Sequence, residues 1–273
     1  MPTRGEARAA AIARIDPLDA DVLVAHALGI TKESLYAHPE VPLTRSEATH
    51  VAELVERRAA GEPVAYLRGS KEFYGLRFAV DRRVLIPRPE TETLVDAVRA
   101  FVRERGPCLV ADVGTGSGAI AIALAAREPG VRVIATDVSS DALAVARANV
   151  AAHRVAERVE LRQGDLLAPI KERVDAVAAN LPYLRDDAVH ELVGDRTSLA
   201  FEPAVAVVAG ADGLALIRRC VADLPRVLAP GGAAFFECDP PQARSIAAFW
   251  AGPSHVLRDP VGAERVVVLE QRE

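Results

Sequence analysis

The sequence predicts a doubly wound α/β domain preceded by a small helical domain. Residues 1 to about 60 carry apolar residues at helical spacing. After residue 92, short apolar runs alternate with amphipathic stretches, a pattern typical of a parallel sheet covered by helices on both faces. The length of 273 residues, 50% of them hydrophobic, is sufficient for one large core and a smaller second unit.

The helical domain is predicted to span residues 1–75. One apolar stripe consists of Leu18, Val22, Ala25 and Leu28, and a later stripe consists of Val51, Leu54 and Val55. Thr44 and Glu47 have the spacing of a capping box at the start of the later helix. Gly61 and Pro63 are expected to end that helix.

A β-hairpin is predicted to link the two domains over residues 76–92. The surrounding stretch, YLRGSKEFYGLRFAVDRRVLIPRPETE, mixes aromatic residues, glycines and alternating apolar residues. A turn at Pro87 and Pro89 is expected to close it.

Residues 93–273 form the predicted α/β domain. Strands are expected at residues 108–114, 132–138, 159–165, 174–180 and 232–238, with HVLRD and RVVVLE closing the chain. Helices are expected at residues 117–128, 140–153, 213–228 and 241–250. In such sheets ligands bind outside the carboxyl ends of the strands, so the residues that end each strand are the candidates for a functional site.

Charge and cysteine content limit the function classes. The balance of 33 basic and 38 acidic residues leaves a net charge of -5, which gives no general basic face for nucleic acid. Cys108, Cys220 and Cys238 have neither paired spacing nor accompanying histidines, so we expect neither a metal site nor disulfides. Because there is no signal peptide and no apolar run near the ~18 residues of a membrane span, we expect a soluble, cytoplasmic protein without a membrane partner.

A glycine-rich loop follows the first strand of the α/β domain, in ADVGTGSGAIAIALA. Gly114, Gly116 and Gly118 allow a tight turn and the close approach of a ligand, and the next helix begins with free amides. The loop also satisfies a relaxed dinucleotide fingerprint with Asp137 near the acidic position, so a nicotinamide dehydrogenase is one interpretation. No P-loop lysine follows, which counts against nucleoside triphosphate hydrolysis.

With Asp112 included, the loop resembles the first motif of class I methyltransferases that use S-adenosylmethionine. The resemblance implies that the cofactor is bound by Asp112, Gly114, Thr115, Gly116, Ser117 and Gly118, and also by Asn180. It also implies that Asp137 holds the ribose hydroxyls, since a carboxylate accepts two such bonds. In GDLL, Asp165 would meet the adenine amino group and the Leu166 backbone its ring edge. The alternatives are a helix N-terminal role for Asp137 and a turn role for Asp165.

The fourth strand runs into Asn180, Leu181, Pro182 and Tyr183, which resemble the Asn-Pro-Pro-Tyr type of motif in class I methyltransferases that act on planar NH2 groups. Such a nitrogen is a weak nucleophile because its lone pair is delocalised. The Asn180 side-chain oxygen and the Leu181 carbonyl would accept its two hydrogens, which favours a lone pair facing the methyl group. Pro182 would stiffen the turn, and Tyr183 would offer a flat face to the substrate.

Over about 270 residues the chain resembles the HemK/PrmC family of protein-(glutamine-N5) methyltransferases, which modify the Gly-Gly-Gln glutamine of peptide chain release factors. The resemblance is carried by RRAAGEPVAYLRGSKEFYGLRF, VLIPRPETE, FEPAVAVVAGADGL, LPRVLAPGG and RDPVGAERVV. It implies one antiparallel strand near the C-terminus, and a helical domain and hairpin that grip a protein substrate. Nucleic acid would then be met only indirectly, through the translation machinery. Arg88 and Glu90 would border the site, although a linker salt bridge is an equally good reading.

Two departures from the family pattern leave other substrates open. Leu181 replaces a proline, and Asn-Leu-Pro-Tyr is more familiar from RNA adenine dimethyltransferases; Asp239, Pro240 and Pro241 change the loop after the fifth strand. The alternatives are an N6-adenine methyltransferase of RNA or DNA, a glutamine methyltransferase of a ribosomal or other protein, and a cofactor-binding paralogue without catalysis. Net charge counts against the first and intact Asn180 and Tyr183 against the last. A dehydrogenase leaves residues 180–183 without a role.

Overall fold

A computed structural model of the chain describes residues 1–185 and 199–272. The chain divides into two compact units: Met1–Ser70 belongs to the first, and the chain from Lys71 onward, apart from a short segment ending at Phe201, belongs to the second. The division falls a few residues before the predicted end of the helical domain at residue 75. Residues 186–198 of the predicted α/β domain lie outside the described part of the chain.

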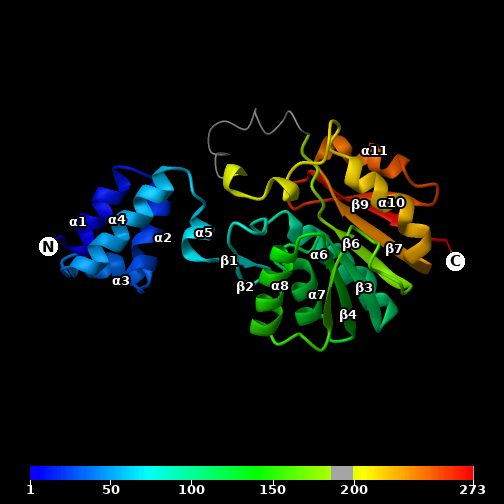
Figure 1. The fold of residues 1–273 in the computed structure, drawn as a ribbon, viewed down its shortest axis with the longest axis horizontal. Helices are drawn as coiled ribbons and strands as arrows, with labels where there is room; N and C mark the ends of the chain where they lie inside the picture. The colour runs from blue at the N-terminus through cyan, green and yellow to red at the C-terminus, as the bar shows by residue number, and fades with distance from the viewer. Residues whose placement is uncertain (186–198, 273) are drawn as a thin grey trace. The chain divides into compact units, whose positions relative to one another are not determined.

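The first unit is helical (Figure 1). Its helices are α1 (Arg4–Ile12), α2 (Pro17–Ala27), α3 (Lys32–Ala37), α4 (Arg45–Ala59) and α5 (Val64–Arg68). The capping box at the start of α4 is confirmed, since the Thr44 hydroxyl accepts from the Glu47 amide at 3.2 Å and the Glu47 carboxylate accepts from the Thr44 amide at 2.7 Å. The predicted stripe of Val51, Leu54 and Val55 is buried.

The predicted stripe through Leu18 is only partly correct, because Ala25 is buried and Leu28 packs against the core but Leu18 does not. Leu18 is 63% exposed, whereas Ala20, Leu23 and Val24 form the buried face of α2. The reason is the position of the helix start: Asp16 is the N-cap and accepts from the Leu18 amide at 2.8 Å, which places Leu18 in the first turn on the solvent side.

A β-hairpin is present, but its turn is not where the prolines predicted it. The strands are β1 (Ser70–Phe73) and β2 (Leu76–Ala79), joined by Tyr74 and Gly75. Both turn residues have positive φ, 54° and 68°, the pattern of a type I′ turn that matches the twist of paired strands. Pro87 and Pro89 lie after the hairpin, in irregular chain that precedes helix α6 (Thr91–Arg105).

The second unit contains the predicted α/β sheet, in the strand order β5-β4-β3-β6-β7-β9-β8. Its strands are β3 (Cys108–Val113), β4 (Val131–Asp137), β5 (Val159–Gln163), β6 (Val174–Ala179), β7 (Leu228–Glu237), β8 (Ser254–Arg258) and β9 (Glu264–Glu270). The neighbours from β5 to β7 pair in parallel, and β9 pairs antiparallel with both β7 and β8. The expected mostly parallel sheet with one antiparallel strand near the C-terminus is therefore confirmed.

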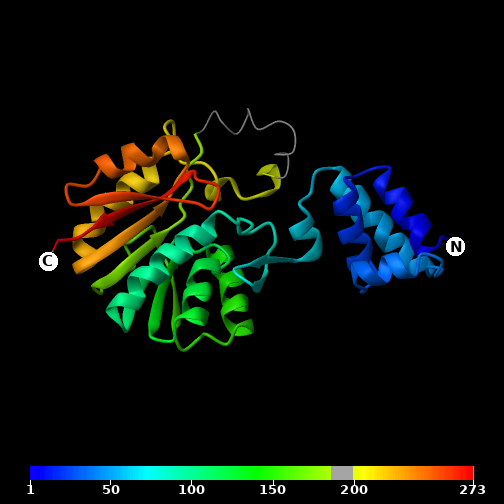
Figure 2. The ribbon, with the colours of Figure 1, turned by 180° about the vertical axis from the view of Figure 1, so that it is seen from behind.

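Helices cover both faces of this sheet, as the two opposite views show (Figure 1 and Figure 2). One group consists of α6, α7 (Ala119–Arg127) and α8 (Ser140–Ala152), and the other of α10 (Ala215–Val227) and α11 (Ala243–Ala248). Helix α6 was not predicted from the sequence, although Leu94, Val95, Val98 and Val102 form its buried stripe. Because α6 packs against β6, β7 and β9, its first residue, Thr91, lies near the ends of these strands.

The described residues contain neither a membrane-spanning helix nor a cluster of metal-binding side chains. None of the helices in residues 1–185 and 199–272 is long and apolar enough to cross a bilayer. Within the same part of the chain, no three or more His, Cys, Asp and Glu side chains are grouped so that they could hold a metal ion.

Candidate active site

The carboxyl ends of strands β3, β4, β5 and β6 meet at one edge of the sheet and enclose a cavity of about 270 Å3. Each of the four strands contributes lining residues from the loop that follows it, among them Gly114, Asp137, Asp165 and Asn180. The strand ends selected from the sequence are therefore brought together in three dimensions. Small-molecule sites typically occupy about 300–1,000 Å3, so the volume of this cavity lies just below the lower end of that range.

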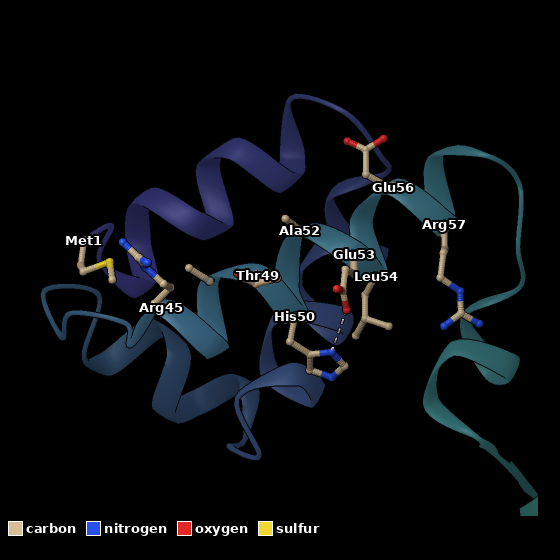
Figure 3. A pocket seen from close by; sticks show the side chains of 10 residues that line it. Met1, Arg45, Thr49, His50, Ala52, Glu53, Leu54, Glu56 and Arg57 are labelled. Atoms are coloured by element: carbon tan, nitrogen blue, oxygen red, sulfur yellow. Dashed lines mark ion pairs between the residues drawn. The ribbon is translucent and has the colours of Figure 1, made fainter.

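A larger hollow of about 790 Å3 lies in the helical unit, along one face of α4 (Figure 3). Its lining includes Met1, Arg45, His50 and Glu53, with an ion pair at 3.9 Å between the last two. This hollow is open and its wall is a regular helix with mixed charges. It offers neither strand ends nor a glycine loop, so we assign the chemistry to the smaller cavity.

The glycine loop serves two purposes. Gly114 and Gly116 line the cavity, and both have positive φ, 73° and 56°. A Cβ atom on Gly114 would lie 3.0 Å from the Leu181 side chain, so the loop and the fourth strand's motif are in close contact. Gly118, which was also expected to bind the cofactor, is the N-cap of α7, and a Cβ there would lie 3.1 Å from Ile122 and 3.4 Å from Ala146. Its small size therefore allows α7 and α8 to pack closely.

Asp112 lies beneath this loop and is fully buried. One carboxylate oxygen, Oδ2, accepts from the Thr115 hydroxyl at 2.6 Å and from the Ala121 amide at 3.1 Å. The other oxygen, Oδ1, is buried without a hydrogen-bond partner. Burial raises the Asp112 pKa to about 6. Asp112 thus braces the loop and the start of α7, and it is not among the residues that line the cavity.

Asp137 lines the cavity at the end of β4. Its Oδ2 accepts from the Gly116 amide and its Oδ1 from the Ser139 amide, each at 2.9 Å. Each carboxylate oxygen has a second lone pair, so Asp137 retains acceptor capacity for hydroxyl groups in the cavity. Ser139, rather than Asp137, caps helix α8 by accepting from the Ala142 amide at 3.1 Å.

Asp165 and Leu166 lie on the next wall of the cavity, after β5. The Asp165 carboxylate is half exposed and pairs with Arg219. Leu166 has a positive φ of 47°, and its carbonyl accepts from the Thr136 hydroxyl at 2.9 Å. The hydrogen bond to Thr136 of β4 fixes this backbone. The edge of the adenine ring, which was predicted to contact the Leu166 backbone, would therefore meet a backbone that is held in place.

The side chain of Asn180 is oriented by helix α6. Its amide nitrogen Nδ2 donates to the Thr91 hydroxyl oxygen at 3.0 Å. Because the nitrogen is directed to Thr91, Oδ1 is the atom of the carboxamide that could accept a hydrogen bond from a ligand. Asn180, Leu181 and Pro182 line the cavity, while the Leu181 side chain itself is buried in the core. The Leu181 side chain therefore belongs to the core, and the predicted role of its backbone carbonyl does not depend on a proline at this position.

Tyr183 packs against the same core, and burial raises its pKa above the usual value. Its ring is not among the described lining residues of the cavity, so the flat face expected from the sequence is set back from it. Its carbonyl accepts from Gln242 Nε2 at 3.0 Å. Gln242 also forms a capping box with Asp239. The unusual loop of Asp239, Pro240 and Pro241 therefore still positions the Gln242 side chain against residues 180–183.

Gly213 lies close to the same carbonyl and leaves room for it. It has a φ of +70°, and a Cβ there would lie 2.2 Å from the Tyr183 carbonyl oxygen and 2.9 Å from Gln242 Nε2. We expect Gly213→Ala to destabilise the protein by roughly 3 kcal/mol and to lower kcat, because residues 180–183 must shift. Urea unfolding and initial rates measure the two effects.

Gly262→Ala is the matched control. Gly262 also has a positive φ, 88°, but nothing lies within 4 Å of a Cβ built there. It should cost only the conformational strain, about 1 kcal/mol, and leave kcat unchanged. Equal effects of the two substitutions on kcat would contradict the supporting role of Gly213.

The segment before α6 is tied to the loop beyond the motif. Glu202, whose side chain is fully buried, forms an ion pair with Arg88 and accepts from the Ile86 amide at 3.0 Å. The neighbouring Pro203 lines the cavity. Of the two interpretations of Arg88, the structure therefore contains the salt bridge, and this salt bridge joins two segments at the cavity's edge.

Glu237, at the end of β7, is a buried acid that sequence reasoning missed. Burial raises its pKa from 4.5 to about 7, and its Oε2 has no hydrogen-bond partner. An acid with a raised pKa in the folded state stabilises the fold fully below pH 4.5, and this contribution is lost as the pH rises through about 7. We expect Glu237→Gln to raise the free energy of unfolding at pH 8 by on the order of 2 kcal/mol, and by much less at pH 5.

Denaturant unfolding at the two pH values tests this expectation. Glu264→Gln, at a partly exposed position on β9, is the control and should show little dependence on pH. A Glu237→Gln variant that is less stable than the wild type at pH 8 would show that the carboxylate is not the costly form.

Comparison with known sequences gave consistent results over both units. Residues 5–69 match the family profile of the PrmC N-terminal domain, and residues 91–200 match that of the methyltransferase small domain. The chain is 41% identical to the release factor glutamine methyltransferase of Xylella fastidiosa over 85% of this chain and 83% of that protein. It is 39% identical to the protein of the same name from Bordetella pertussis, over 91% and 93%.

Solved structures show similarity of fold. A methyltransferase from Pyrococcus furiosus superposes with a TM-score of 0.54 at 16% identity, covering 81% of this chain and 98% of that one. A 16S rRNA methyltransferase of T. thermophilus in complex with AdoMet and guanosine has a TM-score of 0.52 at 18% identity, covering 74% and 50%.

Proposed function

The chain belongs to the release factor glutamine methyltransferases, and on that premise we propose that it methylates a class I peptide chain release factor through a site centred on Asn180. It is an S-adenosylmethionine-dependent enzyme, and its reaction is the methylation of a glutamine side chain. The observation that carries the residue assignment is the hydrogen bond from Asn180 Nδ2 to Thr91, which leaves Oδ1 to accept from a substrate NH2 group.

The residues around the cavity fit S-adenosylmethionine. Asp137 would accept hydrogen bonds from the ribose hydroxyls, and Asp165 from the adenine amino group, beside the Leu166 backbone. Gly114 and Gly116 allow close approach of the backbone, with Asp112, Thr115, Ser117 and Gly118 holding the loop and the start of α7 in place. The bound cofactor supplies the methyl group as an activated sulfonium substituent.

The contribution of the chain's own residues is to position a weak nucleophile. Asn180 Oδ1 and the Leu181 carbonyl would accept the two hydrogens of the glutamine amide, which fixes the nitrogen and favours a lone pair directed at the methyl group. Pro182 restricts the backbone that presents this carbonyl, and Tyr183 anchors the turn through its contact with Gln242. Holding two reactants in attack geometry contributes about 7 kcal/mol or more in favourable cases. As the amide nitrogen bonds the methyl carbon, the carbon–sulfur bond breaks, S-adenosylhomocysteine is the leaving group, and the methylated amide releases one proton to water without a dedicated base.

The helical unit and the hairpin are proposed to bind the protein substrate, with residues 93–273 holding the cofactor. A cytoplasmic location is also proposed, because release factors act in translation there. Cys108, Cys220 and Cys238 are free and buried, as suits a reducing compartment.

The test is methylation with a labelled donor, using purified release factor, ribosomal proteins and RNA in parallel. We expect label on the glutamine of a Gly-Gly-Gln segment, located by peptide mass spectrometry, and none on RNA. A release factor in which that glutamine is replaced by asparagine is the matched control substrate. Label on the replaced protein, or on adenine, would contradict the proposed partner.

A further inference from the structure

The carboxyl ends of β6 and β7 and the start of helix α6 lie close together next to Asn180. Ala179 of β6 is paired in parallel with Phe236 of β7, so Asn180 and Glu237 are the next residues on neighbouring strands. Thr91, the first residue of α6, lies beside both: its hydroxyl accepts from Asn180 Nδ2 at 3.0 Å, and it is close enough to the Glu237 carboxylate to act as a donor that lowers the Glu237 pKa. Thr91 and Glu237 are both almost completely buried, so water competes little for these bonds.

We propose that Glu237 is a positioning residue for methyl transfer: through the Thr91 hydroxyl, its carboxylate fixes the Asn180 carboxamide with Oδ1 turned toward the substrate. The proposal rests on the assignment of Asn180 as the substrate acceptor and adds the reason why that amide faces the correct way. Neither Thr91 nor Glu237 lines the cavity. Both therefore act through Asn180.

The Thr91 hydroxyl has a single hydrogen, so it can donate to only one of its two neighbours. An ionised carboxylate only accepts, so Thr91 must donate its hydrogen to Glu237 and has only lone pairs left for Asn180. Asn180 must then present its NH2 group to Thr91, which directs Oδ1 away from it. When Glu237 is protonated it can donate to Thr91 instead, and the released hydroxyl hydrogen can bond Oδ1 of a flipped carboxamide. A flipped Asn180 would direct its NH2 group at the NH2 group of the substrate. Both groups are hydrogen-bond donors, so no hydrogen bond could form between them.

The charged groups around Glu237 define its titration. Arg265 of β9 faces it and favours the ionised form, as does Arg88 from the segment before α6. Glu90, at the N-cap of α6, opposes it, and the Tyr183 phenol lies close enough for its own pKa to be raised by Glu237. Both cations are shared with other acids, Arg265 with Asp259 at 3.3 Å and Arg88 with Glu202. Burial is the largest influence and raises the Glu237 pKa to about 7.

The first test uses Thr91→Val and Thr91→Ser in the full-length protein. Valine keeps the shape of threonine but has no hydroxyl, so kcat should fall on the order of tenfold, the equivalent of one lost hydrogen bond or slightly more. KM for the release factor should change less than kcat, and calorimetry should give an unchanged Kd for S-adenosylmethionine. Serine retains the hydroxyl and should restore kcat to within about twofold of the wild type. Thr93→Val, two residues along α6, is the control for the substitution itself.

The second test is the pH profile, which decides the question even where Thr91→Val does not fold. Wild-type kcat should rise with pH through the titration of Glu237 and then level off. In Glu237→Gln this acid limb should vanish, and the pH-independent rate should lie roughly fivefold below the wild-type plateau, because glutamine can direct either its oxygen or its NH2 group to Thr91. Carboxyl carbon NMR, with the Glu237 resonance identified by its absence in Glu237→Gln, should give a midpoint that matches the acid limb.

The outcomes separate this proposal from the one on which it rests. An unchanged kcat in Thr91→Val, no recovery in Thr91→Ser, or an acid limb that persists in Glu237→Gln overturns the positioning role. Loss of activity in Asn180→Ala alongside any of these results leaves the acceptor role of Asn180 in place. Normal turnover in Asn180→Ala instead overturns the acceptor role, and with it the reason for the positioning.

Discussion

Asn180→Ala is expected to lower kcat on the order of 100- to 1,000-fold, as the loss of an oriented acceptor in a catalytic site does in other enzymes. The alanine side chain leaves no acceptor for the glutamine NH2 group, while Asp137 and Asp165 on the cofactor side of the cavity remain unchanged. The Kd for S-adenosylmethionine should therefore stay within about twofold of the wild type. Single-turnover rates and calorimetry measure the two quantities.

Asn180→Asp is the matched control for this prediction. It keeps an oxygen at the same position but replaces the NH2 group that donates to Thr91. Its activity should lie between those of the wild type and Asn180→Ala. Wild-type turnover in the alanine variant, with the protein folded, would show that Asn180 does not hold the nucleophile.

Asp137→Ala is expected to weaken S-adenosylmethionine binding on the order of 100-fold, because two hydrogen bonds to a charged acceptor contribute about 1.5–3 kcal/mol each and part of that is lost to water. The substitution also frees the Gly116 and Ser139 amides that the carboxylate now holds. Isothermal titration calorimetry with S-adenosylhomocysteine gives the change in Kd without turnover.

Asp141→Ala, in the first turn of α8, is the control for Asp137→Ala. It removes a carboxylate close by in the sequence that is not among the lining residues of the cavity. We expect its Kd to change less than about twofold. Equal affinities of Asp137→Ala and the wild type would contradict the ribose assignment.

The regular part of the fold could be predicted because its signals are local. The strands from β3 to β6 are short, apolar and bounded by glycines or polar residues, so their ends fell within two residues of the observed ones. Helix α6 was missed because VLIPRPETE was interpreted as a turn. The prolines are a correct signal for irregular chain, but the helix begins directly after them. Leu18 was wrongly assigned to the apolar stripe because the helix start, set by Asp16, decides which residues face the core, whereas Ala25 of the same stripe is buried as predicted.

The residues of the candidate site likewise divide into those with a local sequence signal and those without one. Asp137, Asp165 and Asn180 were predicted because parallel strands bring residues at their ends to one edge of the sheet. Thr91 and Gln242 were not, since each contacts the motif from a distant part of the chain. Glu237 was not, because a buried acid at a strand end has no local pattern. Gly118 and Asp112 matched the glycine-loop pattern, yet Gly118 packs against α7 and α8, and Asp112 binds Thr115 of the loop and the start of α7.

The grip of Gln242 and Gly213 on the Tyr183 carbonyl has a consequence for protein engineering. Transplanting residues 180–183 into another enzyme of this fold would carry the letters of the motif without its external brace. A functional graft would have to include the loop after β7 and the glycine turn before α10 as well. In this chain, the structural unit that would have to be transferred together is therefore larger than residues 180–183, the tetrapeptide that identifies the motif in the sequence.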